Sequence, residues 1–299
     1  MNPDRPSSTA LLIAASTLLL RHDAPGANLV SPEAADYCTQ FLRAAGPSAA
    51  RVLDLAGRGW FRRAVGMLES ITIPGIQVHY ALRKRYVRDW VLHNIREGYP
   101  QIVVLGAGLD TLCLELHARL PEACFVEVDH PATQRVKVQT LTAMGVSPRN
   151  VFFVPADLSS TRLDEALAAC PGYAPTRKTL FVAEGLFMYL EPDCVNGLLD
   201  YVTRRTQNRI AFTFLEPRRD GKPNFRIASR LVDEWLNLGR ERFRWGVRRS
   251  ELGGFLASRG LRLAQVTDDE TFARCFPIGV FAGDAPSVGE YVCTAEAKP

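Results

Sequence analysis

The segment between residues 101 and 129 constrains the fold of this chain more than any other part of it. An apolar run at 101–105 ends at Gly106-x-Gly108, and a second apolar run at 125–128 ends at Asp129, 23 residues after Gly106. A buried parallel strand, a glycine turn and an acid at the end of the next strand are typical of a nucleotide-binding βαβ unit. The segment therefore predicts a cofactor that contains a nucleoside.

The composition excludes several classes of protein. The chain has 299 residues, of which 47% are hydrophobic, and its net charge is only +4. Its basic residues form only small clusters, so we expect no nucleic-acid partner. The seven cysteines contain no CxxC pair, which argues against a disulfide framework or a zinc site and favours a reducing compartment. We therefore expect a cytoplasmic protein without a bound metal.

An apolar run near the N-terminus, residues 10–20, could be taken for a targeting segment. It is shorter than the ~20 residues that a membrane-spanning helix needs, and no clean cleavage site follows it. Ser7, Ser8 or Thr9 could cap a helix at its start. The run is interpreted as a buried core helix, and we expect no membrane partner.

Short apolar runs alternate with helical stretches from residue 101 onward. Parallel strands joined by helices, with both faces of the sheet covered, would give this alternation. The strands are expected at 101–105, 124–128, 151–154, 179–183 and 209–215. The helices between them are expected at 110–119, 131–144, 161–169 and 192–206.

The rest of the chain is expected to add to a single domain that spans 1–299. Residues 1–98 look like a helical cap, with loop breaks at 25–26, 46–47 and 74–75 and an amphipathic helix at 80–95. The cofactor-binding core would span 99–216, and a charged segment at 217–250, with Trp235 and Trp245, is a candidate substrate lid. Residues 251–299 would add a helix at 250–259 and two last strands, at 261–267 and 289–295.

The glycine turn does not fit a dinucleotide. The third glycine of a dinucleotide fingerprint, which lies beside the pyrophosphate, would fall at position 111, where this chain has Thr111. The absence of that glycine disfavours NAD. A cofactor with a nucleoside but no phosphates fits better.

Two acids are candidates for binding that nucleoside. Asp129 could accept hydrogen bonds from both ribose hydroxyls, although it could also be a surface acid or cap the helix expected at Pro131. Asp157 ends the third strand at the same edge of the sheet, where it could accept a bond from an adenine amino group while the Leu158 N–H bonds a ring nitrogen. Its alternative role is to cap the following helix.

Two further charged residues are candidates for the other end of the cofactor. Glu184 follows three apolar residues at the end of the fourth strand, so it is partly buried and needs a partner such as an ammonium group. Arg83 could provide a charge-assisted bond to a carboxylate, unless it is an ordinary solvated arginine on a basic helix face. Adenine, ribose, an ammonium and a carboxylate together describe S-adenosylmethionine (SAM).

Four motifs carry a resemblance to a known family. They are Leu105-Gly-Ala-Gly-Leu-Asp-Thr111, Val126-Glu-Val-Asp-His-Pro131, Ala156-Asp-Leu158 and Ala183-Glu-Gly-Leu-Phe-Met-Tyr-Leu190. From residue 9 to about 215 the chain resembles the leucine carboxyl methyltransferase family of SAM-dependent O-methyltransferases. The resemblance implies an α/β fold of the Rossmann-like class I methyltransferase type. Its doubly wound, mostly parallel, seven-stranded sheet would have an N-terminal helical cap and a lid insertion after the fifth strand.

The resemblance also assigns roles to single residues. It implies that Arg83 holds the methionine carboxylate, that Gly106 contacts the methionine part and that Glu184 lies near the methionine amino group. It implies that Asp129 binds the ribose, and that Asp157 and Leu158 contact the adenine. The match is weakest after residue 217, where we expect the choice of substrate to be made.

The sequence identifies no catalytic residue. None of the five histidines has a convincing catalytic context: His22, His79, His93, His117 and His130. Because a carboxylate acceptor is already ionised at neutral pH whereas a phenol or alcohol wants a general base, this slightly favours a carboxylate. We therefore expect an O-methyltransferase (EC 2.1.1) whose partner is a small molecule with a carboxylate or hydroxyl. The alternatives are methylation of a protein C-terminal carboxylate, NAD-dependent oxidation and a non-catalytic scaffold.

Overall fold

Five parallel strands form the centre of the molecule, and each begins within one residue of where the sequence predicts it. In the computed structural model, which describes residues 6–22, 26–218, 221–226, 242–275 and 288–298, their bounds are as follows. They are β1 (Gln101–Leu105), β2 (Cys124–Asp129), β3 (Val151–Pro155), β4 (Thr179–Ala183) and β5 (Arg209–Leu215). β1, β4 and nearly all of β2 and β5 are buried, as the continuous apolar runs predict.

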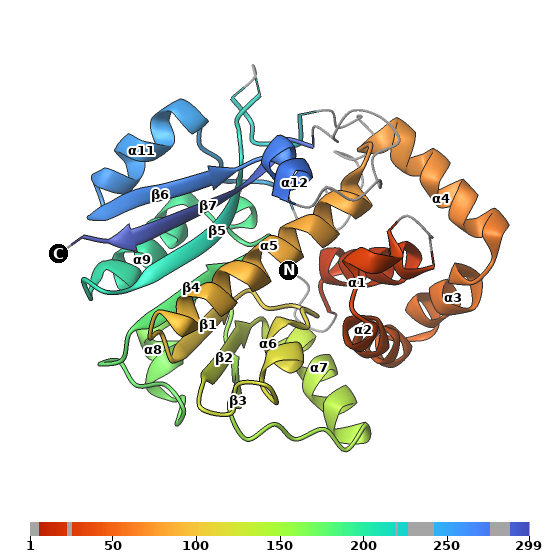
Figure 1. Ribbon diagram of the computed structural model, residues 1–299, viewed down its shortest axis with the longest axis horizontal. Coiled ribbons are helices and arrows are strands. Elements are labelled where there is room, and N and C mark those ends of the chain that lie inside the picture. The colour runs from red at the N-terminus through yellow and green to blue at the C-terminus, as the bar shows by residue number, and fades with distance from the viewer. Residues whose placement is uncertain (1–5, 23–25, 219–220, 227–241, 276–287, 299) are drawn as a thin grey trace.

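Two further strands complete a seven-stranded sheet within the described residues. These are β6 (Leu261–Thr267) and β7 (Glu290–Ala297), and the strand order is β3-β2-β1-β4-β5-β7-β6. β7 lies between β5 and β6 and is antiparallel to both, whereas β1 to β5 are parallel. The doubly wound, mostly parallel sheet expected from the sequence is confirmed (Figure 1).

Most helices before β1 gather at the right of the sheet in Figure 1, and the last of them crosses in front of the strands. Their bounds are α1 (Ser8–Arg21), η1 (Ala27–Leu29), α2 (Pro32–Ala44), α3 (Pro47–Ala56), α4 (Gly59–Thr72) and α5 (Ile76–Arg96). Ser7 caps α1 by accepting a hydrogen bond from the Ala10 N–H at 3.2 Å. The breaks expected at 46–47 and 74–75 separate helices as predicted, but α5 begins four residues earlier than expected.

The remaining helices connect the strands. They are α6 (Leu112–Leu116), α7 (Pro131–Ala143), α8 (Leu163–Ala168), η2 (Phe187–Tyr189), α9 (Pro192–Thr203), α11 (Arg249–Ala257) and α12 (Asp269–Cys275). One hydrophobic cluster joins the sheet to α1, α2, α5 and α6, and a second cluster on the other face joins it to α8, α9 and α11. The sheet is therefore covered on both faces, as predicted.

The segment proposed as a lid, 217–250, is described only in part. Trp235 lies outside the described residues, while Trp245 is 5% exposed and its ring centroid lies 5.7 Å from that of Phe187. Residues around Trp245 thus pack on the second hydrophobic cluster. The lid itself stays a prediction.

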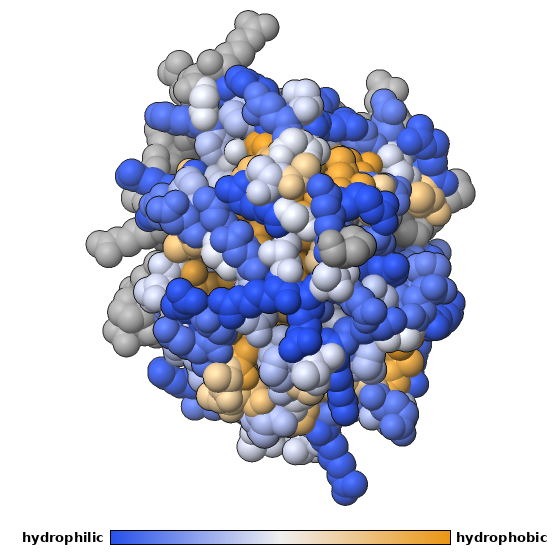
Figure 2. Space-filling model, turned by 90° about the vertical axis from the view of Figure 1, so that its left-hand side faces the viewer, coloured by the Kyte–Doolittle hydropathy of each residue, from blue (hydrophilic) through white to orange (hydrophobic). Residues whose placement is uncertain are grey.

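The hydrophobic segments and the surface were compared with what a membrane protein would need. Among the residues that the structure describes, no helix is long and apolar enough to cross a membrane. Figure 2 shows that the face at the left of Figure 1 is mostly hydrophilic, with small separate hydrophobic patches. The apolar run at 10–20 forms most of α1, whose residues Ala14, Leu18 and Leu20 lie in the first hydrophobic cluster.

Candidate functional site

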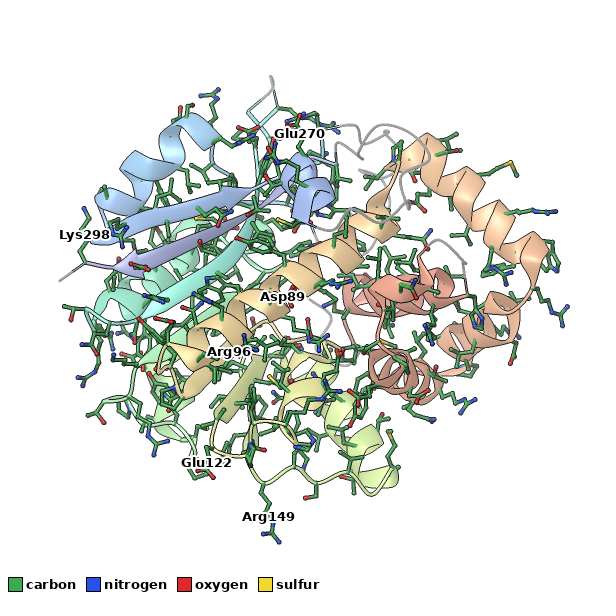
Figure 3. All side chains as sticks on the ribbon, viewed as in Figure 1. Asp89, Arg96, Glu122, Arg149, Glu270 and Lys298 are labelled. Carbon is green, nitrogen blue, oxygen red and sulfur yellow. The ribbon has the colours of Figure 1, made fainter. Side chains whose placement is uncertain are left out.

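A cavity of about 720 Å³ opens at the C-terminal ends of β1 to β4, between the sheet and the helices α1 and α5. Its size lies within the usual range for small-molecule sites, about 300–1,000 Å³. All six residues predicted to bind the cofactor line it: Arg83, Gly106, Asp129, Asp157, Leu158 and Glu184. At the opposite edge of the sheet, charged side chains point away from the molecule. Glu122 and Arg149, which precede β2 and β3, project outward there (Figure 3).

The turn after β1 requires its glycines. Gly106 and Gly108 have φ angles of 64° and 52°, in the left-handed region that glycine adopts readily. A Cβ on Gly106 would lie 2.7 Å from a Leu186 methyl carbon, and one on Gly108 would lie 3.2 Å from the Ala10 Cβ. The turn therefore brings bare backbone to the cavity wall.

Asp129 is fixed by this turn. One of its carboxylate oxygens accepts a hydrogen bond from the Gly108 N–H, and the other accepts one from the His130 N–H at 2.6 Å. Burial raises the pKa of Asp129 to about 6, against the lowering effect of these two N–H groups. His130, not Asp129, caps α7, because its Nδ1 accepts from the Ala132 N–H at 3.3 Å. The alternative of Asp129 as a helix cap is therefore wrong.

Asp157 holds a turn beyond β3. Its Oδ1 accepts hydrogen bonds from the Ser159 N–H at 2.9 Å and the Ser159 hydroxyl at 2.6 Å. Although partial burial would raise the pKa of Asp157, the bonds from Ser159 lower it. Because α8 begins only at Leu163, with Arg162 as its N-cap residue, Asp157 does not cap that helix. Leu158, beside it, is buried.

Arg83 and Glu184, which the family resemblance places at the methionine end, contact each other directly. The Arg83 Nε and Nη2 both lie 2.9 Å from Glu184 Oε1. Arg83 Nη1 donates to both carboxylate oxygens of Glu290, at 2.7 and 2.6 Å, and His79 Nε2 lies 3.0 Å from Glu290 Oε2. Arg83 is only 2% exposed, so it is not a solvated surface arginine. We call Arg83, Glu184, Glu290 and His79 the cavity group.

Glu290 is the member of the cavity group that the sequence analysis does not name. Although burial alone would raise the pKa of this carboxyl, the Arg83 guanidinium and the His79 ring lower it to about 2. The residue opens the last strand, and an acid directly before the apolar run Tyr291-Val-Cys293 is the available signal. Its partner on α5 is 207 residues away in the chain, which the sequence does not reveal.

Lys84 and Asp110 extend the cavity group. The Lys84 Nζ contacts Asp110 and lies 3.3 Å from Glu184 Oε1. The Asp110 main-chain carbonyl accepts from Lys137 Nζ at 2.5 Å, and this ammonium also lies 2.5 Å from Glu127 Oε2. Lys137 and Glu127 are each 1% exposed, and we call them the sealed pair.

The donors and acceptors on this cavity fit SAM. Asp129 has a carboxylate on the cavity wall, as a ribose site requires, and the two ion pairs of Glu184 both use Oε1, so Oε2 has no partner among the described residues. A free carboxylate oxygen is a suitable acceptor for an ammonium group. The Arg83 Nη2 is the atom nearest to a Cβ built on Gly185, at 3.6 Å, so glycine keeps space open beside the guanidinium. Within the described residues, no cluster of potential metal ligands was found.

Comparison with solved structures agrees with the doubly wound fold described above. In solved structures, a provisionally assigned methyltransferase from Thermobifida fusca matches 87% of this chain and 94% of its own, with a TM-score of 0.58 and 16% identity. A protein from Streptomyces avermitilis matches 80% and 91%, with a TM-score of 0.55 and 16% identity. At this level of identity the likeness shows the fold, which is that of the Rossmann-like class I methyltransferases.

Sequence comparison then gives the family. The family model described as leucine carboxyl methyltransferase matches residues 20–203, and the chain belongs to this family. A relative from Frankia alni is 29% identical over 213 residues, and one from Mycobacterium tuberculosis is 31% identical over 201. Both are provisionally named S-adenosyl-L-methionine-dependent methyltransferases. The matches cover 68% and 64% of this chain and 67% and 64% of the relatives.

Proposed function

We propose that this protein is an O-methyltransferase that transfers a methyl group to a carboxylate of a small molecule. The chain is a SAM-dependent methyltransferase, and SAM is its cofactor. When bound, SAM supplies an electrophilic methyl group on its sulfonium. The identity of the accepting oxygen is the part that we propose.

The residues of this chain have binding and positioning roles in the proposed reaction. Asp129 would anchor the ribose, and Asp157 with the Leu158 N–H would contact the adenine. Arg83 and Glu184 would hold the carboxylate and ammonium of the methionine part. Because a carboxylate acceptor needs no deprotonation, proximity, alignment and exclusion of water would account for most of the rate enhancement.

The observation that carries the proposal is which polar groups around the cavity already have hydrogen-bond or ion-pair partners. His130, which is the histidine that lines the described part of the cavity, already accepts a hydrogen bond at Nδ1 from the Ala132 N–H. By contrast Arg88 and Arg242, which also line it, have no hydrogen-bond or ion-pair partner in the part of the chain that the structure describes, and the Arg88 Nε is buried. Free guanidinium groups without a free histidine base favour an anionic acceptor over a phenol or alcohol.

Incubation with methyl-labelled SAM and panels of small carboxylic acids and phenols tests the proposal. We expect labelled acids, identified by mass spectrometry, whose label is lost in alkali because the product is an ester. Labelled phenols with alkali-stable ethers would contradict the carboxylate assignment while leaving the methyltransferase class intact. A peptide with a free C-terminus and its amidated form, in the same assay, test the alternative of protein carboxyl methylation.

NAD-dependent oxidation and a non-catalytic scaffold find less support than methyl transfer. Membership of a methyltransferase family argues against an NAD-dependent oxidoreductase, and Thr111 donates from its hydroxyl to Glu115 at 2.7 Å where a dinucleotide site has glycine. A non-catalytic scaffold would bind S-adenosylhomocysteine but label no acceptor in the labelling assay.

A further inference from the structure

Glu290 reaches the cavity group because β7 runs against the direction of β5. In this antiparallel pair Glu290 lies opposite Leu215, so the first residue of β7 is next to the C-terminal end of β5. The C-terminal ends of the parallel strands form the cavity edge. An acid at the start of β7 is therefore placed beneath the cavity, where it is 1% exposed.

The Arg83 guanidinium is held from several sides. Nη1 donates to both oxygens of Glu290, and Nε donates to Glu184 Oε1. Nη2 forms an ion pair with the same Glu184 oxygen at 2.9 Å, and the guanidinium carbon lies 4.9 Å from the centre of the Tyr80 ring. Arginine has five N–H donors, two of them on Nη2, so at least one Nη2 hydrogen is left. The space beside Nη2 is kept open by Gly185.

Glu290 also determines what Glu184 can do. A guanidinium pairs best with a carboxylate when two parallel N–H donors meet its two oxygens. Both Glu290 oxygens bind Nη1, which holds the guanidinium in an orientation where Glu184 binds Nε and Nη2 through Oε1 alone and keeps Oε2 without a partner among the described residues. Without Glu290, Arg83 would be free to turn and pair with both Glu184 oxygens, which would remove the acceptor for an ammonium and the donor for a carboxylate.

We propose that Glu290 is a positioning residue for the amino-acid end of the cofactor: it fixes Arg83 so that one Arg83 N–H and one Glu184 oxygen stay available. This proposal rests on the proposed function, because it takes SAM as the ligand. Glu290 itself acts only through Arg83. His79, at 3.0 Å from Oε2, orients the Glu290 carboxylate in turn.

Two ligands separate this role from a general role in folding. S-adenosylhomocysteine has the amino-acid end, whereas 5′-methylthioadenosine has adenine and ribose but no amino-acid end. By calorimetric titration we expect Glu290→Gln to weaken S-adenosylhomocysteine binding at least about tenfold and 5′-methylthioadenosine binding by less than about twofold, since only the first ligand needs the charge-assisted bonds. Circular dichroism and urea denaturation show whether the variant is folded.

Glu296→Gln is the matched control. Glu296 lies on the same strand, but it is partly exposed and pairs with Arg209 and Arg262 away from the cavity lining. We expect this variant to bind both ligands as the wild type does. If Glu290→Gln does not fold, Glu290→Asp replaces it in the test, because it keeps the charge on a shorter side chain. We again expect a loss of affinity for S-adenosylhomocysteine only.

Three results would overturn the proposal. Equal losses for the two ligands would make Glu290 a residue of general structural importance, and unchanged affinities would show that Arg83 needs no support from it. Wild-type protein that binds neither ligand would refute the cofactor assignment on which the proposal rests. Wild-type binding of both ligands therefore separates failure of this proposal from failure of the proposed function.

Discussion

The cavity group and the sealed pair are both buried ionic clusters, yet they face different surroundings. Lys137 and Glu127 are enclosed between α7 and β2, each 1% exposed, and their contacts are satisfied within the protein. In the cavity group, Arg83 and Glu184 line a cavity, and one Glu184 oxygen has no partner within the described chain. The comparison indicates that the charges of the sealed pair neutralise each other completely, whereas the cavity group keeps one acceptor and one donor free to bind a ligand.

The largest effect is expected from breaking the sealed pair. Lys137→Met leaves the Glu127 carboxylate buried without a counter-charge, which should lower the free energy of unfolding by about 3–5 kcal/mol, measured by urea denaturation near neutral pH. The double variant Lys137→Met, Glu127→Leu should recover most of this loss, because apolar residues often replace a buried ion pair at little cost. A loss as large in the double as in the single variant would contradict this interpretation.

A substitution in the cavity group should have a smaller effect, and on ligand affinity more than on stability. Glu184→Gln should weaken S-adenosylhomocysteine binding by about 1.5–3 kcal/mol, because a charged hydrogen bond to the ammonium is lost. Its free energy of unfolding should change less than that of Lys137→Met, since Arg83 keeps Glu290 and Lys84 keeps Asp110. Calorimetry measures the affinity, and urea denaturation the free energy of unfolding, of both Glu184→Gln and Lys137→Met. A Glu184→Gln variant that loses stability but retains affinity would contradict the distinction between the two clusters.

The smallest effect is a pH dependence at the ribose end. Burial raises the pKa of Asp129 to about 6, and its ionised form is the better acceptor for ribose hydroxyls. Affinity for S-adenosylhomocysteine should therefore rise as the pH increases through 6 and level off above it, with a total change of about tenfold for one pKa unit of coupling. Titrations over this range should show no such rise for Asp129→Asn. Glu290 does not contribute, because its pKa of about 2 keeps it ionised throughout.

The same comparison shows what the sequence can predict. Asp129, Asp157 and Glu184 each follow or end a strand of the parallel sheet, and parallel strands bring such ends to one edge, so their convergence follows from local patterns alone. β1, β4, β5 and β6 have the predicted bounds, because glycine, proline and polar residues interrupt the apolar runs. All three residues line one cavity, although their contacts with SAM stay predictions.

Ion pairs between different helices, strands and turns cannot be predicted in the same way. Lys84 belongs to a basic cluster in the sequence, and its contact with Asp110 depends on how α5 crosses the turn after β1. Lys137 and Glu127 fall in segments predicted as a helix and a strand, but neither pattern says that an ammonium is buried there. The role of Glu290 depends on the antiparallel insertion of β7, which apolar periodicity does not specify.

The insertion of β7 between β5 and β6 also affects the order in which the molecule can be assembled. The Arg83–Glu290 contact spans 207 residues, and proteins dominated by such non-local contacts fold slowly. Until β7 docks, the Arg83 guanidinium has Glu184 but lacks the second of its two carboxylate partners. Competence to bind the amino-acid end of SAM would thus arise late in folding, so partly folded chains would sequester little of the methyl donor.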